Sequence, residues 1–323
     1  MPLSDLLAQR SLLMLDGAMG TELGRHGVDL SAPLWSARAL ISMPHVVRTL
    51  HFHYLHAGAD IITTNTFRSN IRALRKAGME SEWEELNLRA VQLAFEARDR
   101  FQPARPVLIA GGLAPVEDCY RPEDVPPDDE LREEHRRQAA LLAMTGVDVL
   151  LAETMMTIRE AVIAAEACAA TGKEFAVSFV TDAEGTLLSG ETLKDAVTAV
   201  APYTPVALLL NCVAATQMKQ AYAALRACTS LPTGCYANTG QPGPKETDGL
   251  RRDADIAGYV TASRDWVAAG ARIIGGCCGT TPEYIEALTG EHAPETLAFQ
   301  KNEIDAYYEE RYGRRPDTDA KPH

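Results

Sequence analysis

Val206-Ala207-Leu208-Leu209-Leu210-Asn211-Cys212 is a continuous apolar run that ends on two polar side chains. A short apolar run without alternation is typical of a strand that is buried on both faces, as in a parallel sheet. Seven further runs that are rich in apolar and β-branched residues recur through the chain. The eight predicted strands cover residues 12–16, 59–65, 106–111, 147–153, 174–180, 206–212, 234–238 and 271–277.

Segments with helical periodicity separate these strands. The predicted helices cover residues 44–57, 82–100, 129–145, 158–171, 193–201, 214–228 and 255–269. Repeated strand and helix units indicate an α/β protein with a parallel sheet, and eight strands indicate a closed (β/α)8 TIM barrel. An open doubly wound sheet is the alternative architecture. No Gly-x-Gly-x-x-Gly sequence opens a helix after the first strand, which favours the barrel.

The barrel is expected to form a single domain over residues 1–290. Residues 291–323 are expected to form a C-terminal extension, with a short helix at 302–312 and a disordered tail at the end. One connection, residues 112–130, is long and rich in prolines and acids. Such a segment is either a lid or binding loop, or a solvated acidic surface.

Composition excludes several classes of protein. Among 323 residues, 46% are hydrophobic and 23% are charged, as in ordinary folded domains. The net charge of −13 would repel phosphate backbones and anionic membranes, so neither nucleic acid nor a membrane is an expected partner. The first residues do not resemble a secretory leader, and no apolar run reaches membrane-spanning length. We therefore expect a cytoplasmic protein whose seven cysteines stay reduced.

Polar side chains gather at the carboxyl ends of the predicted strands, where barrel enzymes place their catalytic groups. These residues are Asp16, Asn65, Glu153, Asn211, Cys212, Asn238, Cys277 and Cys278. Histidines cluster elsewhere, on the predicted helix 44–57, away from any strand end. We interpret that cluster as a packed or solvated helix face rather than a metal site.

Two adjacent cysteines, Cys277 and Cys278, lie in a glycine-rich run that ends with Gly279-Thr280-Thr281-Pro282. Neighbouring side chains on a strand point to opposite faces, so both thiols reach one metal only if the backbone turns there, as glycine permits. With Cys212 they would supply three thiolates and an open fourth position, which is typical of catalytic zinc. Inert or redox-active cysteines are the alternative. The remaining ones are expected to pack as small apolar side chains: Cys119, Cys168, Cys228 and Cys235.

Together, several motifs resemble the zinc-dependent homocysteine S-methyltransferase family over about residues 8–290. They are Asp16-Gly17-Ala18-Met19-Gly20-Thr21-Glu22-Leu23, Pro33-Leu34-Trp35-Ser36, Thr64-Asn65-Thr66-Phe67, Glu153-Thr154, Asn211-Cys212, Tyr236-Ala237-Asn238 and the Gly-Gly-Cys-Cys-Gly-Thr-Thr-Pro run. The family includes enzymes that use S-methylmethionine or betaine, and the homocysteine module of cobalamin-dependent methionine synthase. The resemblance implies that Cys212, Cys277 and Cys278 bind Zn2+ and that the sulfur of homocysteine takes the fourth position. A free thiol is largely protonated at neutral pH, whereas a metal-bound thiol is not.

The resemblance also implies roles for the neighbouring residues. Glu153 is expected to hold the substrate ammonium with Asp16 in the same cluster, although both acids could instead bind backbone amides of nearby loops. Backbone amides at Gly17 and Ala18 are expected to bind the substrate carboxylate, unless the glycine serves only the turn. Asn238 is expected to bind or flank the metal when substrate is absent.

The methyl donor is expected to lie near Trp35, which matches an aromatic residue of the betaine-using members and can attract a cationic methyl group. Those members have tyrosine where this chain has Arg68 and Thr154. An arginine would repel a compact cation but could pair with a donor carboxylate, so the sequence favours S-methylmethionine or a related sulfonium. A pocket built instead around Tyr120 is the alternative for the donor.

Three other functions remain open from the sequence. They are a betaine-dependent enzyme, a subunit of a split cobalamin-dependent system, and a non-catalytic zinc-binding partner protein. We expect no cobalamin or folate module after the barrel motifs. The expected partners are thus homocysteine and a small methyl donor, and the sequence predicts no oligomeric state.

Overall fold

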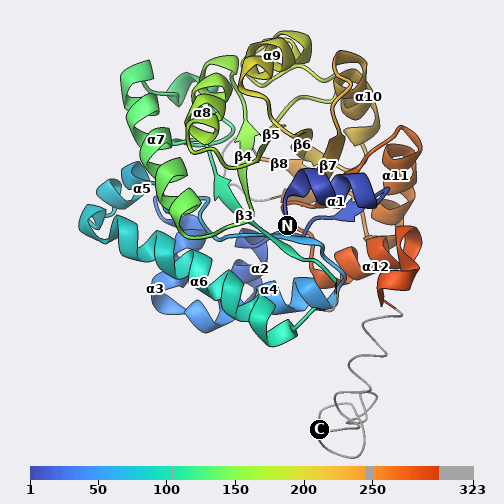
Figure 1. The fold of residues 1–323 in the computed structure, drawn as a ribbon, viewed down its shortest axis with the longest axis horizontal. Helices are drawn as coiled ribbons and strands as arrows, with labels where there is room; N and C mark the ends of the chain where they lie inside the picture. The colour runs from blue at the N-terminus through green and yellow to red at the C-terminus, as the bar shows by residue number, and fades with distance from the viewer. Residues whose placement is uncertain (104, 244–249, 298–323) are drawn as a thin grey trace, which may run out of the picture.

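Eight parallel strands form a barrel in the computed structural model, which describes residues 1–103, 105–243 and 250–297 (Figure 1). The strands follow the order β1-β10-β7-β6-β5-β4-β3-β2, and a parallel bridge between Leu15 and Ile61 joins the two ends of the sheet. Their bounds are β1 Leu13–Met14, β2 Ile61–Thr63, β3 Leu108–Leu113, β4 Val149–Met155, β5 Phe175–Phe179, β6 Ala207–Ala214, β7 Thr233–Asn238 and β10 Ile273–Gly276. The (β/α)8 prediction is confirmed, and each predicted strand is present.

Helices surround the barrel (Figure 1). They are α4 Pro44–His56, α6 Trp83–Phe101, α7 Asp128–Met144, α8 Ile158–Ala170, α9 Leu193–Val200, α10 Met218–Cys228, α11 Ile256–Ala268 and α12 Pro282–His292. Side-chain caps define several of their starts, because an unpaired backbone N–H at a helix N-terminus needs an acceptor. Thr157 accepts from Glu160, Thr192 accepts from Asp195, and Asp255 accepts from Gly258.

A first helix, α1 Leu3–Gln9, closes the amino-terminal end of the barrel and crosses in front of the strands in Figure 1. Leu3, Leu6 and Leu7 pack into the apolar interior that the inward-facing strand residues form. Arg272, just before β10, donates to Leu7 O and thereby ties the helix to the strand starts. Any pocket with access to solvent is therefore expected at the opposite, carboxyl-terminal end.

Short elements occupy the connections that the sequence left as loops. They are α2 Gly20–Arg25, η1 Trp35–Arg38, α3 Ala39–Ser42, α5 Ile71–Lys76, η2 Glu80–Glu82, η3 Pro122–Asp124 and η4 Ala201–Tyr203. An antiparallel pair, β8 Gly240–Pro242 with β9 Leu250–Arg252, also follows β7 and was not predicted. Gly240 permits this pairing, because a Cβ there would lie 2.1 Å from Arg251 O.

Two predicted boundaries differ from the structure. The helix predicted to start at residue 214 begins at Met218, because β6 continues to Ala214. The predicted loop 112–130 begins inside β3, which extends to Leu113. The predicted helix at 302–312 and the tail lie outside the described residues. Within the part that is described, no helix is both long and apolar enough to span a membrane.

Candidate active site

A pocket of about 180 Å³ opens at the carboxyl-terminal end of the barrel. Its walls combine strand ends with the loops that follow β1, β2, β3 and β7. Six of the eight predicted polar residues line it, together with several aromatic side chains, whereas Asn211 and Asn238 do not. The lining includes Asp16, Gly17, Ala18, Trp35, Asn65, Phe67, Cys119, Tyr120, Glu153, Thr154, Cys212, Tyr236, Cys277 and Cys278.

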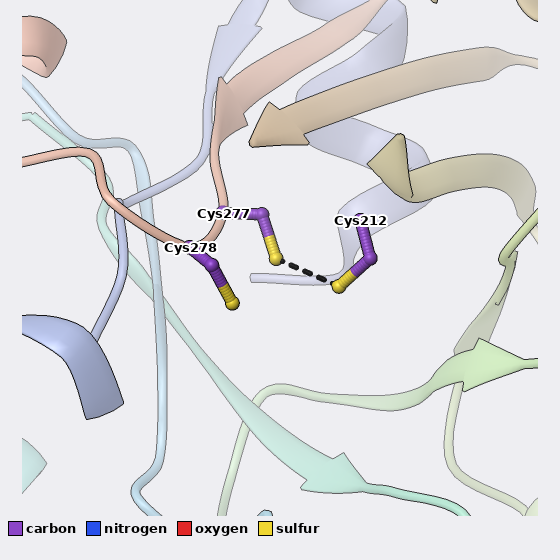
Figure 2. A group of neighbouring side chains, drawn as sticks. All are labelled: Cys212, Cys277 and Cys278. Carbon is purple, nitrogen blue, oxygen red and sulfur yellow. Dashed lines mark hydrogen bonds between the residues drawn. The ribbon is translucent and has the colours of Figure 1, made fainter. Parts of the chain in front are cut away.

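Three thiols converge in this pocket (Figure 2). Cys212 lies near the end of β6, and Cys277 and Cys278 directly follow β10; their three Sγ atoms all lie within 4.8 Å of one another. The backbone turns here as predicted, since Thr280 N donates to Cys277 O and Gly279 has a φ of 83°. A Cβ on Gly279 would lie 2.1 Å from Thr239 Oγ1, so a larger residue would push the turn away.

The donor set fits a zinc ion. Tetrahedral coordination with Zn–S bonds of ~2.3 Å places two sulfurs roughly 3.8 Å apart, and Cys212 Sγ lies 3.1 Å from Cys277 Sγ, within a small adjustment of that spacing. Hydrogen bonds from Cys212 and Cys278 lower the pKa of Cys277 well below that of an ordinary thiol. The pKa values of Cys212 and Cys278 are raised instead, in Cys212 chiefly by its hydrogen bonds with Cys277 and Cys278, so Cys277 is the thiol that carries negative charge beside the open position.

The other four cysteines lie apart from this cluster. Cys168 and Cys235 are wholly buried and burial raises the pKa of each thiol, so they are poor nucleophiles. Cys228 donates to Ala224 O within its own helix. Cys119 is buried as predicted, but it also lines the pocket beside Tyr120, which the sequence did not indicate.

Asp16, which follows β1, and Glu153 in β4 line the same pocket. Burial raises the pKa of Asp16 to about 8, against hydrogen bonds from Thr63. Burial also raises the pKa of Glu153 well above its ordinary value, the charges of Cys277 and Asp16 add to this effect, and Arg68 opposes it. Two acids and a thiolate held this close repel one another, so the site favours a cationic ligand group.

Both carboxylate oxygens of Asp16 accept hydrogen bonds from a neighbouring residue of the barrel. Thr63 N donates to its Oδ2 at 2.7 Å, and Thr63 Oγ1 donates to its Oδ1 at 3.3 Å. Asp16 thus binds a backbone amide, which the sequence analysis gave as the alternative to a role in substrate binding. Glu153 is partly exposed to the pocket, and its Oε1 would lie 2.9 Å from a Cβ on Gly112, so that glycine makes room for it.

The loop after β1 is held tightly. Ala18 N donates to Thr280 Oγ1 at 3.1 Å, and Tyr54 Oη donates to Ala18 O at 2.8 Å. A Cβ on Gly17 would lie 2.7 Å from the Tyr54 ring, so the glycine permits the close approach of that tyrosine. The amide of Ala18 is thus already used, which leaves that of Gly17 as the nearer candidate for a substrate carboxylate.

Trp35 and Phe67 form an aromatic wall, with ring centroids 5.8 Å apart. The indole rests on Gly20, where a Cβ would lie 2.2 Å from the ring. Arg68 is buried, stacks 4.6 Å over the Phe67 ring and donates to Pro115 O. It lines an adjoining cavity of about 160 Å³, which shares Trp35 with the main pocket.

Asn238 lies behind the cysteines. Its Nδ2 donates to Cys212 O at 2.9 Å, and its buried Oδ1 has no hydrogen-bond partner among the described residues. Sequence reasoning did not assign Phe67 or Tyr236 to the site. Tyr236 is 3% exposed and lies next to Glu153. Both stand inside the motifs quoted above, which was the available signal.

Comparisons with known proteins agree with this geometry. The family model described as homocysteine S-methyltransferase matches residues 13–291. The homocysteine S-methyltransferase of Escherichia coli (strain K12) is 33% identical, over 89% of this chain and 97% of that protein. A selenocysteine methyltransferase of Astragalus bisulcatus is 31% identical, over 85% and 90%.

A solved structure is also similar, the metallated form of the E. coli homocysteine methyltransferase MmuM. It superposes with a TM-score of 0.79 at 32% identity, over 90% of this chain and 99% of that one. The family model covers most of the barrel, and the resemblance inferred from the motifs is confirmed. The chain belongs to the homocysteine S-methyltransferase family.

Proposed function

We propose that the protein transfers a methyl group from a small sulfonium donor to the sulfur of homocysteine, giving methionine, at a zinc ion held by Cys212, Cys277 and Cys278. The observation that carries the proposal is the convergence of three thiols beside two carboxylates at the open end of the barrel. A metal site of this kind has room for one more sulfur ligand. The carboxylates match the ammonium of an amino-acid thiol.

Zinc, when bound, would supply a positive charge that keeps the thiol of homocysteine deprotonated and nucleophilic at neutral pH. The chain's own residues then orient the substrate. Glu153 binds the ammonium, with Asp16 behind it, and the arriving cation returns the acids to their ionised form. The amide of Gly17 accommodates the substrate carboxylate, and Asn238 donates a hydrogen bond to the backbone oxygen of Cys212.

The reaction forms one carbon–sulfur bond on homocysteine and breaks one on the donor, whose sulfur keeps the electron pair. The proton of the homocysteine thiol leaves to solvent when the thiolate forms. Trp35 and Phe67 present aromatic faces to the cationic methyl group of the donor. Reactants that are held in line gain much of their rate from orientation alone.

S-methylmethionine suits the pocket better than betaine. The guanidinium of Arg68 is close enough to lower the pKa of Glu153, so positive charge lies near the donor space. Betaine holds its ammonium close to its carboxylate, whereas S-methylmethionine separates the sulfonium from its carboxylate by several bonds. A separated carboxylate can approach Arg68 while the methyl group points at the thiol.

The protein is also proposed to act in the cytoplasm with small molecules as partners. All seven cysteines are free thiols, including the three that would bind metal, and a reducing compartment preserves them. The net charge of −13 disfavours nucleic acid as a partner.

A donor panel tests this function. Zinc-loaded protein is mixed with homocysteine and either S-methylmethionine or betaine, and methionine is measured by mass spectrometry. Selenocysteine is included as a second acceptor, because one similar protein is named a selenocysteine methyltransferase. We expect turnover with S-methylmethionine above turnover with betaine, and a smaller gap in Arg68→Tyr. Stoichiometric zinc without methyl transfer from either donor would instead support a non-catalytic zinc-binding protein, or a subunit that needs a corrinoid partner.

A further inference from the structure

Asn211 lies behind the thiol cluster and does not line the pocket. It is wholly buried within β6, one residue before Cys212. Its Oδ1 accepts hydrogen bonds from Thr154 N at 3.1 Å and from Ser178 Oγ at 2.7 Å. Its Nδ2 donates to Thr154 Oγ1 at 2.7 Å and to Cys212 Sγ at 3.3 Å. One side chain thus connects β4, β5 and β6.

The two residues that Asn211 joins both have a strained backbone. Thr154 has a φ of 62° and Cys212 has a φ of 58°, in the left-handed region that favours glycine. Such a conformation is unfavourable for residues other than glycine and is unusual for a β-branched residue such as threonine. Backbone strain of this kind persists only where surrounding contacts hold it.

Each strained residue also lies at an irregularity of its strand. The pairing of β4 with β5 shifts between Ala152 and Met155, and that of β6 with β7 shifts between Asn211 and Ala214. Bulges of this kind re-aim neighbouring side chains, and they recur next to active sites. Here they aim Glu153, which precedes Thr154, and Cys212 into the same pocket.

We propose that Asn211 is a positioning residue that locks these two bulges together, so that the Cys212 thiol and the Glu153 carboxylate keep one fixed separation. This rests on the proposed function, in which Cys212 binds the metal and Glu153 binds the substrate ammonium. The position of the Cys212 thiol (Figure 2) and the position of the ammonium site therefore depend on the same side chain. A change at Asn211 disturbs both, although Asn211 touches neither the metal nor the substrate.

Asn211→Asp tests the proposal with little change in shape. The carboxylate still accepts from Thr154 N and Ser178 Oγ, and Thr154 Oγ1 can turn to donate to it, but it cannot donate to Cys212 Sγ. Ser178→Ala is the matched control, because it removes a bond from the far side of Asn211 and leaves those to Thr154 and Cys212. Circular dichroism and the thermal midpoint verify that each variant is folded.

Cobalt(II) in place of zinc provides the first readout, the absorption spectrum of its thiolate and ligand-field bands. In Asn211→Asp we expect altered bands and cobalt affinity about 10- to 100-fold weaker, the usual cost of losing a hydrogen bond behind a metal ligand. Ser178→Ala should keep the wild-type spectrum. This readout needs neither homocysteine nor a methyl donor, so it tests the effect of Asn211 on the metal site even if the proposed function is wrong.

The second readout compares homocysteine with 4-mercaptobutanoate, which lacks the ammonium, as ligands that change the cobalt spectrum. Wild type should prefer homocysteine, and in Asn211→Asp this preference should fall roughly two- to tenfold, the range of one hydrogen bond. A lower thermal midpoint with an unchanged spectrum and preference would overturn the proposal, because Asn211 would then only stabilise the fold. A changed spectrum with an unchanged preference would also overturn it, because the two sites would be independent.

Discussion

The two ends of the barrel are built from different interactions. At the amino-terminal end, α1 inserts leucines into the barrel, and Asp60 is wholly buried between Arg10, Arg105 and the backbone of β1. At the carboxyl-terminal end, two acids and three thiols face one pocket, and three residues that line it have left-handed backbone conformations: Trp35, Thr154 and Cys212. One end therefore stabilises the barrel, and the other uses that stability to hold groups that repel one another.

The largest effect is expected from removing a metal ligand. Cys278→Ala should lose most bound zinc and methyl transfer, yet remain folded, because the thiol lies at a strand end rather than in the core. Zinc is measured by elemental analysis of the dialysed protein, with Cys168→Ala and Cys119→Ala as controls that keep their metal. Full zinc in Cys278→Ala would contradict the assignment of the adjacent pair.

At the amino-terminal end of the barrel, a substitution is expected to change stability rather than zinc binding. Asp60→Ala should lower the free energy of unfolding by about 3–5 kcal/mol, since it leaves two arginines without their buried partner. Glu80→Gln breaks an exposed ion pair with Arg75 and should cost less than about 1 kcal/mol. Urea unfolding measures both. If Asp60→Ala changed zinc affinity more than stability, the division between the two ends would be wrong.

An intermediate effect is expected at Glu153. Glu153→Gln keeps the shape but removes the charge that faces the substrate ammonium, worth about 1.5–3 kcal/mol. Homocysteine should bind roughly 10- to 100-fold more weakly by calorimetry, while 4-mercaptobutanoate should bind as before. Equal binding of homocysteine to variant and wild type would transfer this role to Asp16.

The smallest effect concerns a helix between the two ends. His51 on α4 is wholly buried, neither ring nitrogen has a partner among the described residues, and burial lowers its pKa to about 3. At a pH below about 6.5, the ordinary pKa of histidine, His51 binds a proton in the unfolded chain but not in the folded protein. Stability should therefore fall as the pH drops below 6.5, by about 1 kcal/mol between pH 7 and pH 5.5.

His51→Leu should remove that part of the pH dependence. The comparison is the urea midpoint of variant and wild type at pH 7 and at pH 5.5, where the variant should gain relative to the wild type on acidification. Zinc loss at low pH affects both proteins and cancels in the difference. Parallel pH curves would show that water or a local rearrangement satisfies His51.

The sequence could predict what depends on local pattern. Apolar runs such as 206–212 indicated each strand, and the glycines around Cys277 and Cys278 indicated the turn that brings the thiols together. Strand ends converge at one edge of any parallel barrel, so the meeting of Asp16 and Glu153 followed from the fold.

Other features depend on tertiary contacts that no local pattern contains. A long arginine side chain can turn in many directions, and Arg68 stacks on Phe67 and binds Pro115 O beside the main pocket. Cys212, in its left-handed conformation, accepts a hydrogen bond from Asn211, which also bonds to Thr154, a residue 57 positions away from Asn211 in the sequence. The sequence did not predict β9, because this strand pairs with β8, a short segment that follows β7 and has no apolar run of its own.

The central claim is that three protein thiols and the sulfur of homocysteine share one metal beside the ammonium site. X-ray absorption at the zinc edge tests it most directly, on zinc-loaded protein with and without homocysteine. We predict three sulfur neighbours and one lighter atom at the zinc in the free protein, and four sulfurs at about 2.3 Å after homocysteine binds. An unchanged sulfur count in saturating homocysteine would contradict the account.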